Sequence, residues 1–145
     1  MSDTLIFEIK PLDENIRELY NPHLTFEDNS SKLDLFTPEN ILIKAHSTQM
    51  INFNINVNAY ANGSLNNNNR VAFYMFPKIN IIKTPLRLSC SPIIIEKYCD
   101  NVIHCFVDNI SDTEYLLKKG SIIVKLCGIL MQKVNIVVKQ ESFNA

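Results

Sequence analysis

Hydrophobic and polar residues alternate along much of this 145-residue chain. The clearest case is residues 51–58, Ile-Asn-Phe-Asn-Ile-Asn-Val-Asn, where every second side chain is apolar and the others are all Asn. Successive side chains of a β-strand point to opposite faces of a sheet. The pattern therefore predicts one half-buried strand over residues 51–58, with its apolar face toward a core.

Short apolar runs bounded by Pro, Gly, Asn and Asp predict further strands along the whole chain. They cover residues 5–9, 39–44, 71–76, 79–83, 92–96, 101–107, 113–118, 121–131 and 133–139. Residues 62–69 and 108–112 predict turns, because Asn, Asp and Gly tolerate turn conformations. One helix is expected over residues 13–20, with Asp13 as its cap. Many short strands separated by turns are typical of an all-β sandwich, jelly roll or barrel.

The composition indicates a single globular domain over residues 1–145. Hydrophobic residues make up 46% and charged residues 20% of the chain, which is ordinary for a globular protein. No shift in composition marks an internal boundary. We expect residues 1–31 to hold an N-terminal strand and extension, and residues 140–145 to form a C-terminal tail.

Charge and hydropathy exclude several classes of protein. A formal net charge of −1 provides no basic field for phosphate neutralisation, so no nucleic-acid partner is predicted. No apolar run reaches about 18 residues, so no membrane span is predicted. The acidic N-terminus lacks the basic start of a signal peptide, which favours an intracellular protein. The four cysteines form no C-x-x-C pair and are expected to be buried, reduced thiols rather than zinc ligands.

Two segments in the first part of the chain follow known motif patterns. Residues 32–36, Lys-Leu-Asp-Leu-Phe, resemble a G-x-D-L motif that precedes a strand. Asp34 stands at the aspartate of that motif, and Lys32 replaces its glycine. Residues 77–80, Pro-Lys-Ile-Asn, resemble a P-R-S-G motif that follows a strand, and Lys78 stands at its arginine.

Two segments in the second part follow further motif patterns. Residues 90–109 resemble N-G-x-x-G-x-I-D-x-x-Y-x-G-E and the strand that follows it. Glu96 falls at the aspartate of this pattern and Asn109 at the asparagine that ends the strand. Residues 112–126 resemble a turn, a strand and K-K-G-x-x-I-x-Q-L, in which Lys125 replaces the glutamine.

In this order and spacing, the four segments resemble the trimeric dUTPase family over most of residues 5–131. The resemblance implies a jelly-roll-like fold or distorted β-barrel and a homotrimer. In that family an acidic residue holds the water that attacks the α-phosphate of dUTP, while Mg²⁺ and basic side chains neutralise the triphosphate. The long apolar strands of residues 121–138 are the expected contact surface between subunits.

The residues of that chemistry are only partly present. Lys78 lacks the planar fork with which arginine binds oxyanions, and Glu96 is one methylene longer than aspartate, enough to misplace a catalytic group. Ile79 stands at a serine that contacts phosphate in the family, and it has no side-chain donor. The family's C-terminal R-G-x-x-G-F-G-S-T-G motif is absent from residues 139–145. Three glycines in the whole chain are too few for tight nucleotide-binding loops.

We therefore predict a non-catalytic dUTPase-like protein in which Asp34, Lys78 and Glu96 are vestigial. Judged by local sequence alone, Asp34 is typical of a turn or cap and Glu96 of a solvated charge at a strand end. The protein would bind another protein or serve as a structural component. No cofactor or metal is expected. An Asn- and Ile-rich composition and the resemblance favour a viral source and a location in the host cytoplasm, nucleus or virion.

Two alternatives stay open. The first is a divergent dUTP diphosphatase, which needs Asp34, Lys78 and Glu96 in one pocket together with Mg²⁺. The second is an unrelated jelly-roll module of a virion or a chaperone. Strand connections that differ from the dUTPase order would select the second alternative.

Overall fold

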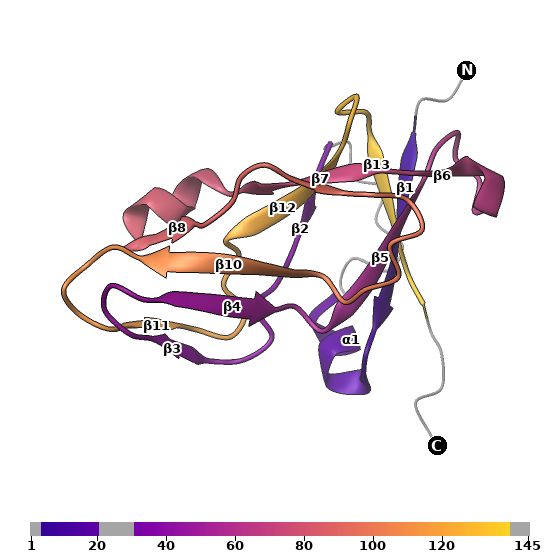
Figure 1. The fold of residues 1–145 in the computed structure, drawn as a ribbon. Helices are drawn as coiled ribbons and strands as arrows, with labels where there is room; N and C mark the ends of the chain where they lie inside the picture. The colour runs from indigo at the N-terminus through magenta and orange to yellow at the C-terminus, as the bar shows by residue number, and fades with distance from the viewer. Residues whose placement is uncertain (1–3, 21–30, 140–145) are drawn as a thin grey trace.

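Strands dominate residues 4–20 and 31–139, the part of the chain that the computed structural model describes (Figure 1). They are β1 (Leu5–Pro11), β2 (Leu33–Asp34), β3 (Ile41–Ile43), β4 (Thr48–Asn52), β5 (Ile55–Tyr60), β6 (Arg70–Val71), β7 (Phe73–Pro77), β8 (Leu86–Leu88), β9 (Ile93–Ile95), β10 (His104–Asn109), β11 (Tyr115–Leu117), β12 (Val124–Gly128) and β13 (Val134–Val138). One α-helix, α1 (Glu14–Tyr20), and the 3-10 helices η2 (Asn67–Asn69) and η3 (Ile79–Lys83) join them in these residues. The predicted all-β class is confirmed.

The strands form four small sheets. Their orders are β13-β1-β5-β6, β2-β12-β7-β9, β4-β10-β8 and β11-β3. Every pair is antiparallel except β1 with β13, which is parallel. Figure 1 shows the first sheet at one end of the molecule and β4, β8, β10, β3 and β11 at the other. The described strands close no barrel, so the jelly-roll-like architecture is the one that fits.

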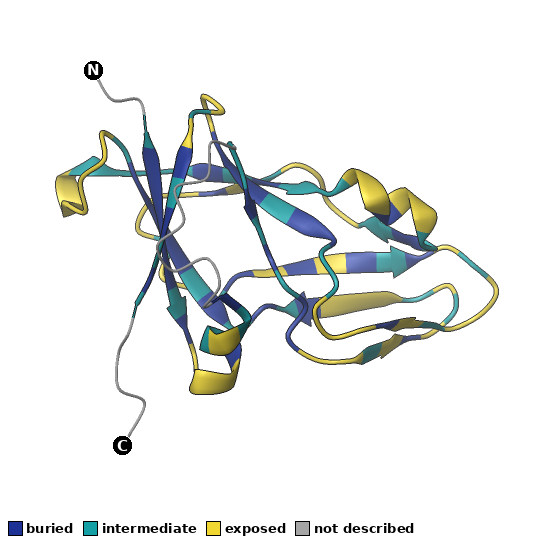
Figure 2. Cartoon of the chain, turned by 180° about the vertical axis from the view of Figure 1, so that it is seen from behind, coloured by how far each residue is buried: buried dark blue, intermediate teal, exposed yellow. Residues whose placement is uncertain are grey.

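The hydrophobic core lies between these sheets. Phe7 on β1 is fully buried, and its ring packs edge to face against Phe73 on β7, with centroids 5.3 Å apart. Figure 2 shows buried residues along the strands and exposed residues in most of the connections. Packing of this kind holds β2, β7 and β12 in a fixed arrangement, which matters because these strands carry the candidate site.

The strand predicted over residues 51–58 is in fact two strands in different sheets. β4 ends at Asn52, β5 begins at Ile55, and Asn54 between them has a φ of 57°. Asn tolerates this left-handed conformation better than most residues. The Asn52 side chain also accepts a hydrogen bond from the Asn54 N–H at 2.8 Å. All four predicted apolar side chains are buried, so the alternation identified the buried face but missed the bend.

Residues 79–83 form the 3-10 helix η3 rather than the predicted strand. A 3-10 helix has three residues per turn, so side chains three apart share a face. Ile79 and Ile82 are 83% and 62% exposed, whereas Ile81 is buried. The sequence of this segment is a short apolar run followed by Lys. Its spacing of apolar residues does not distinguish a 3-10 helix from a strand.

Several other boundaries differ from the prediction. Of residues 121–131 only Val124–Gly128 is strand, and residues 129–131 are exposed. The inward side chains of β12 and β13 are buried in the chain's own core, so the exposed apolar residues of the predicted contact surface are Ile129, Leu130 and Met131 between the two strands. β10 runs to Asn109, into the predicted turn. β2, β6 and β8, each of two or three residues, were not predicted as separate strands.

The predicted helix is confirmed and is attached to the site region. Asp13 caps α1 by accepting a hydrogen bond from the Ile16 N–H at 2.9 Å. Tyr20 at the end of α1 is fully buried. Its hydroxyl accepts a hydrogen bond from the Phe36 N–H at 3.1 Å, and the two rings pack with centroids 5.1 Å apart. The helix therefore anchors the chain just after Asp34.

The cysteines follow the prediction only in part. All four are free; Cys105 and Cys127 are buried as expected, but Cys90 is exposed and Cys99 is half-buried. Burial raises the pKa of the Cys105 thiol to about 12, so this thiol stays protonated and unreactive. No helix among the described residues is both long and apolar enough to cross a bilayer.

Candidate functional site

Asp34 lies on the edge strand β2, where its carboxylate contacts two lysines. Lys32 Nζ lies 3.1 Å and 2.9 Å from the two carboxylate oxygens of Asp34. Lys78, which directly follows β7, places its Nζ 3.1 Å from Asp34 Oδ1. The structure therefore brings two of the three predicted site residues together. It also shows that Asp34 is a strand residue in an ion pair, not the turn or cap that its local sequence suggests.

Lys125 on β12 adds a third cation to this face of the sheet. Its register partners are Asp34 on β2 and Phe76 on β7. Side chains directly opposite each other on antiparallel strands project from the same face. A pocket of about 550 Å³ opens on that face. We call it the lysine pocket; it is lined by Ser31, Lys32, Phe76, Pro77, Ser91, Pro92, Lys125, Cys127 and Met131.

The charges of this cluster compete with one another. Burial acts to raise the pKa of Asp34, but hydrogen bonds from Lys32 and Lys78 and the charges of these lysines outweigh it, so the pKa lies below its usual value. The pKa of Lys78 is lowered, first by the adjacent Lys32 ammonium and then by burial, although Asp34 opposes both. Two ammonium groups therefore share one carboxylate.

Magnesium does not fit this arrangement. Mg²⁺ requires oxygen ligands in near-octahedral geometry. Both carboxylate oxygens of Asp34 already accept hydrogen bonds from ammonium groups, and Lys125 adds positive charge on the same face. No group of three or more His, Cys, Asp or Glu side chains suited to a metal occurs within residues 4–20 and 31–139. The residues present thus disagree with the metal that the dUTPase resemblance implies.

Glu96 lies at the opposite end of the same sheet. It directly follows β9, whose Ile95 pairs with Phe73 at the start of β7, whereas Lys78 follows the end of β7. At about 3.3 Å per residue, this separates Glu96 from Lys78 by about 20 Å along the strand. Glu96 is exposed, which agrees with a solvated charge at a strand end. Within one chain, the three predicted residues do not share a pocket.

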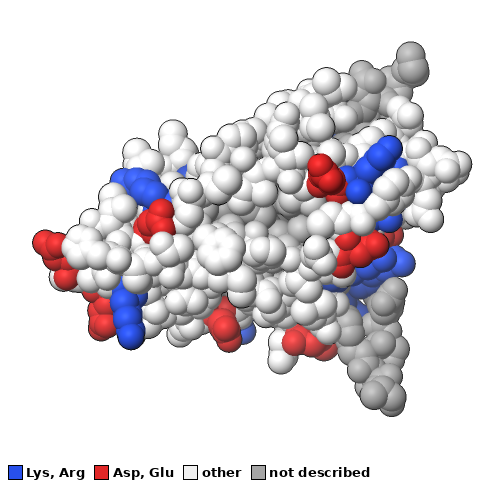
Figure 3. Space-filling view, in the orientation of Figure 1, with Lys and Arg blue, Asp and Glu red and all other residues white. Residues whose placement is uncertain are grey.

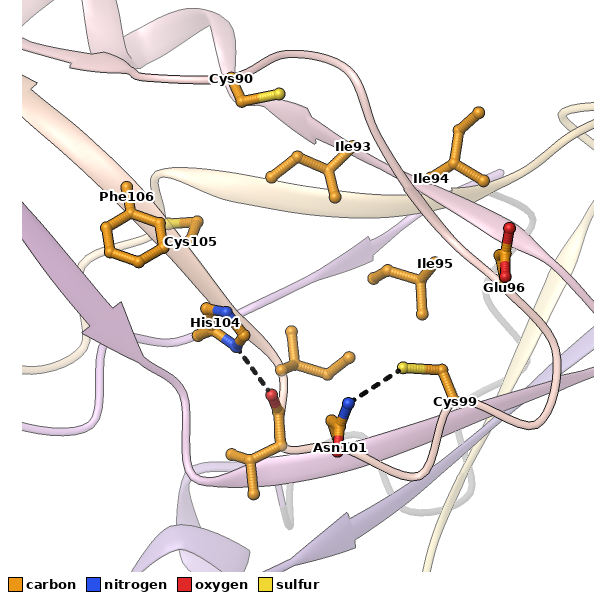
Figure 4. A pocket seen from close by; sticks show the side chains of 12 residues that line it. Cys90, Ile93, Ile94, Ile95, Glu96, Cys99, Asn101, His104, Cys105 and Phe106 are labelled. Carbon is orange, nitrogen blue, oxygen red and sulfur yellow. Dashed lines mark hydrogen bonds between the residues drawn. The ribbon is translucent and has the colours of Figure 1, made fainter.

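A second pocket, of about 490 Å³, lies between β9 and β10 in residues 90–109, the segment that resembles N-G-x-x-G-x-I-D-x-x-Y-x-G-E (Figure 4). Its walls are mainly hydrocarbon and sulfur, from residues such as Ile93, Ile95 and Phe106. Two of its polar side chains are engaged locally: His104 Nδ1 lies 3.0 Å from the Val102 carbonyl, and Asn101 lies 3.7 Å from the Cys99 sulfur. The exposed Glu96 also lines it. This mainly apolar pocket therefore offers few of the donors and acceptors with which a site recognises a base.

Lys32 and Lys125 were not predicted as site residues. In the motif patterns they stand only as replacements of a glycine and a glutamine. With Lys78, three separate motifs each carry a lysine where the pattern has a different residue. These repeated replacements could have identified the lysine cluster from the sequence, because replacement by the same residue type in three motifs indicates a shared electrostatic environment.

Asp34 is expected to make stability depend on pH in acid. Because its folded-state pKa is lowered, its ion pairs contribute above the unfolded pKa of about 3.9 and are lost as the pH falls through the folded value. Asp34→Asn should flatten the decline of the thermal unfolding temperature below about pH 4. A pH series of unfolding curves, with the exposed Glu114→Gln as control, checks this; identical slopes for wild type and Asp34→Asn would contradict it.

Comparison with known proteins supports the fold. No protein-family model matches the sequence, and a search of curated proteins gives no significant match. A mutant dUTPase from phage phi11 of S. aureus matches with a TM-score of 0.58 at 12% identity, over 83% of this chain and 88% of that one. The dUTPase from Streptococcus mutans matches with a TM-score of 0.54 at 19% identity, over 81% and 87%.

A third similar structure is a mutant dUTPase of Staphylococcus bacteriophage 80alpha with dUpNHpp. It matches with a TM-score of 0.56 at 13% identity, over 83% of this chain and 82% of that one. These matches show that the chain has a dUTPase-like fold. This fold does not favour the alternative of an unrelated jelly-roll module. At identities this low, the fold does not establish activity, which has to be argued from the site residues.

Proposed function

We propose that this chain is a non-catalytic dUTPase-like protein that forms a homotrimer and acts by binding another protein or as a structural component. The state of Asp34 carries this proposal. Its carboxylate is bound by Lys32 and Lys78 at 2.9–3.1 Å, so it is not available to orient a metal-bound nucleotide.

Two further positions support the absence of catalysis. Ile79, at the position of the phosphate-contacting serine, is 83% exposed and offers no side-chain donor. Glu96 is exposed beside an apolar pocket, where a nucleotide base would leave its polar groups unpaired. Each buried polar group left without a partner costs about 1–3 kcal/mol.

Contacts between proteins are supported by the surface over β4 and β10. Met50 and Phe106 are register partners on these strands and are 45% and 46% exposed. Figure 3 shows that the middle of this face is uncharged and that acidic and basic side chains lie toward its margins. Depletion of charge and exposure of aromatic and Met side chains are typical of protein interfaces.

The structural neighbours support the assembly and the regulatory or structural role. We propose a trimer because the fold is that of dUTPases. The 80alpha enzyme is one of the phage dUTPases that control transfer of virulence genes by a G protein-like mechanism, so a protein of this fold can act through more than hydrolysis. A viral source and an intracellular or virion location remain part of the proposal.

The proposal is tested with dUTP and Mg²⁺ on the purified chain. We expect no pyrophosphate release above background, no saturable heat with dUpNHpp at high micromolar concentration, and a mass of three chains by light scattering. Saturable dUpNHpp binding at or below about 10 μM would overturn the non-catalytic function. A monomeric mass would overturn the homotrimer alone.

One observation favours the alternative of a divergent dUTP diphosphatase. Asp34 and Lys78 do lie in contact, as an active site would require. The alternative requires Mg²⁺-dependent pyrophosphate release that is lost in both Asp34→Asn and Glu96→Ala. The exposed Glu114→Ala is the matched control and should keep any such activity.

A further inference from the structure

The lysine pocket combines a surplus of positive charge with an apolar wall. We propose that it binds an oxyanion carried on an apolar or aromatic group, without a divalent metal, and that its principal cationic ligands are Lys32 and Lys125, the two lysines that line it. The proposal departs from the dUTPase resemblance, which implies a metal-bound triphosphate. It does not rest on the proposed function, because a protein with or without hydrolase activity can hold such a ligand.

The first argument is the balance of charge. Lys32 and Lys78 contact the single carboxylate of Asp34, and Lys125 is the register partner of Asp34 on the same face. Lys125 forms no ion pair with any residue that the structure describes. Three cations therefore face one anion at this part of the sheet, and one further anion would bring the group closer to neutrality.

The second argument is the partial burial of these charges. The side chains of Lys78 and Asp34 are only 21% and 25% exposed. Charges removed from bulk water interact more strongly and are screened less by salt. The lowered pKa of Lys78, caused first by the neighbouring Lys32 ammonium, reports repulsion between the two lysines. An anion placed between ammonium groups would relieve that repulsion.

The third argument concerns the donors that face the pocket. An ammonium group has three donors that rotate freely, so it binds an oxyanion as a point charge and demands no fixed ligand geometry. Such charge-assisted hydrogen bonds are about twice as strong as neutral ones. Ser31 and Ser91 also line the pocket, and their hydroxyls add neutral donors beside the lysines.

The fourth argument is the apolar wall, which selects the group that carries the anion. Phe76 is the register partner of Lys125 and lies on the same face. Its ring packs against that of Tyr74 with centroids 5.4 Å apart. Pro92 and Met131 also line the pocket. A planar or aliphatic group attached to the oxyanion can cover this wall while its charged end meets the lysines.

The test uses phenyl phosphate, benzoate and inorganic phosphate as probes of the full-length chain. Titration is followed by calorimetry in EDTA and again in Mg²⁺. We expect saturable binding of phenyl phosphate or benzoate in EDTA, at least tenfold tighter than inorganic phosphate, and no tightening by Mg²⁺. The stronger of the two aromatic probes identifies the source of the oxyanion as a phosphate ester or a carboxylate.

Variants locate the site. Lys32→Met and Lys125→Met should each weaken binding by about tenfold or more, as loss of a charged hydrogen bond predicts. Lys118→Met, an exposed lysine outside the pocket, should bind as the wild type does. Lys125→Arg keeps the charge and should retain most of the affinity, which separates loss of the cation from loss of folding. Far-ultraviolet circular dichroism checks that each variant is folded.

Four outcomes would overturn the proposal. The first three are absence of aromatic-anion binding at millimolar concentration, a requirement for Mg²⁺, and equal affinity of the wild type and both Met variants. Inorganic phosphate binding as tightly as phenyl phosphate would also overturn it, because the apolar wall would then contribute nothing. None of these results depends on dUTP hydrolysis, so failure here and failure of the proposed function are distinguished.

Discussion

Phe7→Ala is expected to lower the free energy of unfolding by about 3–5 kcal/mol. Phe7 is fully buried, and its ring meets that of Phe73 edge to face at 5.3 Å. The pair joins the sheet β13-β1-β5-β6 to the sheet β2-β12-β7-β9. Truncation removes the apolar contact of one ring and leaves a cavity between the two sheets. The sheets cannot move together freely to fill this cavity, because the strands of each sheet are held by their own backbone hydrogen bonds.

Chemical denaturation, with the denaturant midpoint and the m-value fitted together, measures this change. Phe106→Ala is the matched control, since Phe106 is 46% exposed and its removal should change stability by no more than about 0.5 kcal/mol. A loss below about 1 kcal/mol for Phe7→Ala would mean that the two sheets are not packed through this residue.

The buried positions could be predicted from the sequence more reliably than the strands themselves. Alternation in residues 51–58 marked Ile51, Phe53, Ile55 and Val57, and all four are buried. The alternation contains no sign that the chain turns at Asn54. The bend depends on which strands lie beside β4 and β5, and these partners, β10 and β1, are distant in sequence.

The same limit applies to the candidate site. Asp34 and Lys78 could be predicted from motif patterns because each motif is local. Lys125 could not be placed beside Asp34, because their proximity follows from the register of β2 on β12, a pairing across about ninety residues of chain. The separation of Glu96 from Lys78 has the same origin, since it depends on where β9 pairs along β7.

The motif pattern identified the position of Asn109 but did not predict its structural role. The resemblance marks it as the asparagine that ends a strand. In the structure it is buried at 2% exposure, and its side-chain N–H groups donate to the carbonyls of Ile43 at 3.1 Å and Thr113 at 2.9 Å. Its Oδ1 accepts hydrogen bonds from the N–H and the hydroxyl of Ser111 at 3.0 Å and 2.8 Å. Asn109 therefore fastens β3 and the turn after β10 together.

Asn109→Ala should consequently lower the free energy of unfolding by about 2–4 kcal/mol, because it leaves buried backbone groups without partners. Asn109→Asp keeps the shape but places a carboxylate oxygen against the Ile43 and Thr113 carbonyls, so it should destabilise at least as much at neutral pH. Equilibrium denaturation of both variants measures the effect, with the exposed Asn101→Ala as control. If Asn109→Asp were as stable as the wild type, the two donated hydrogen bonds would contribute nothing, and the strand end would have to be held by β10 pairing alone.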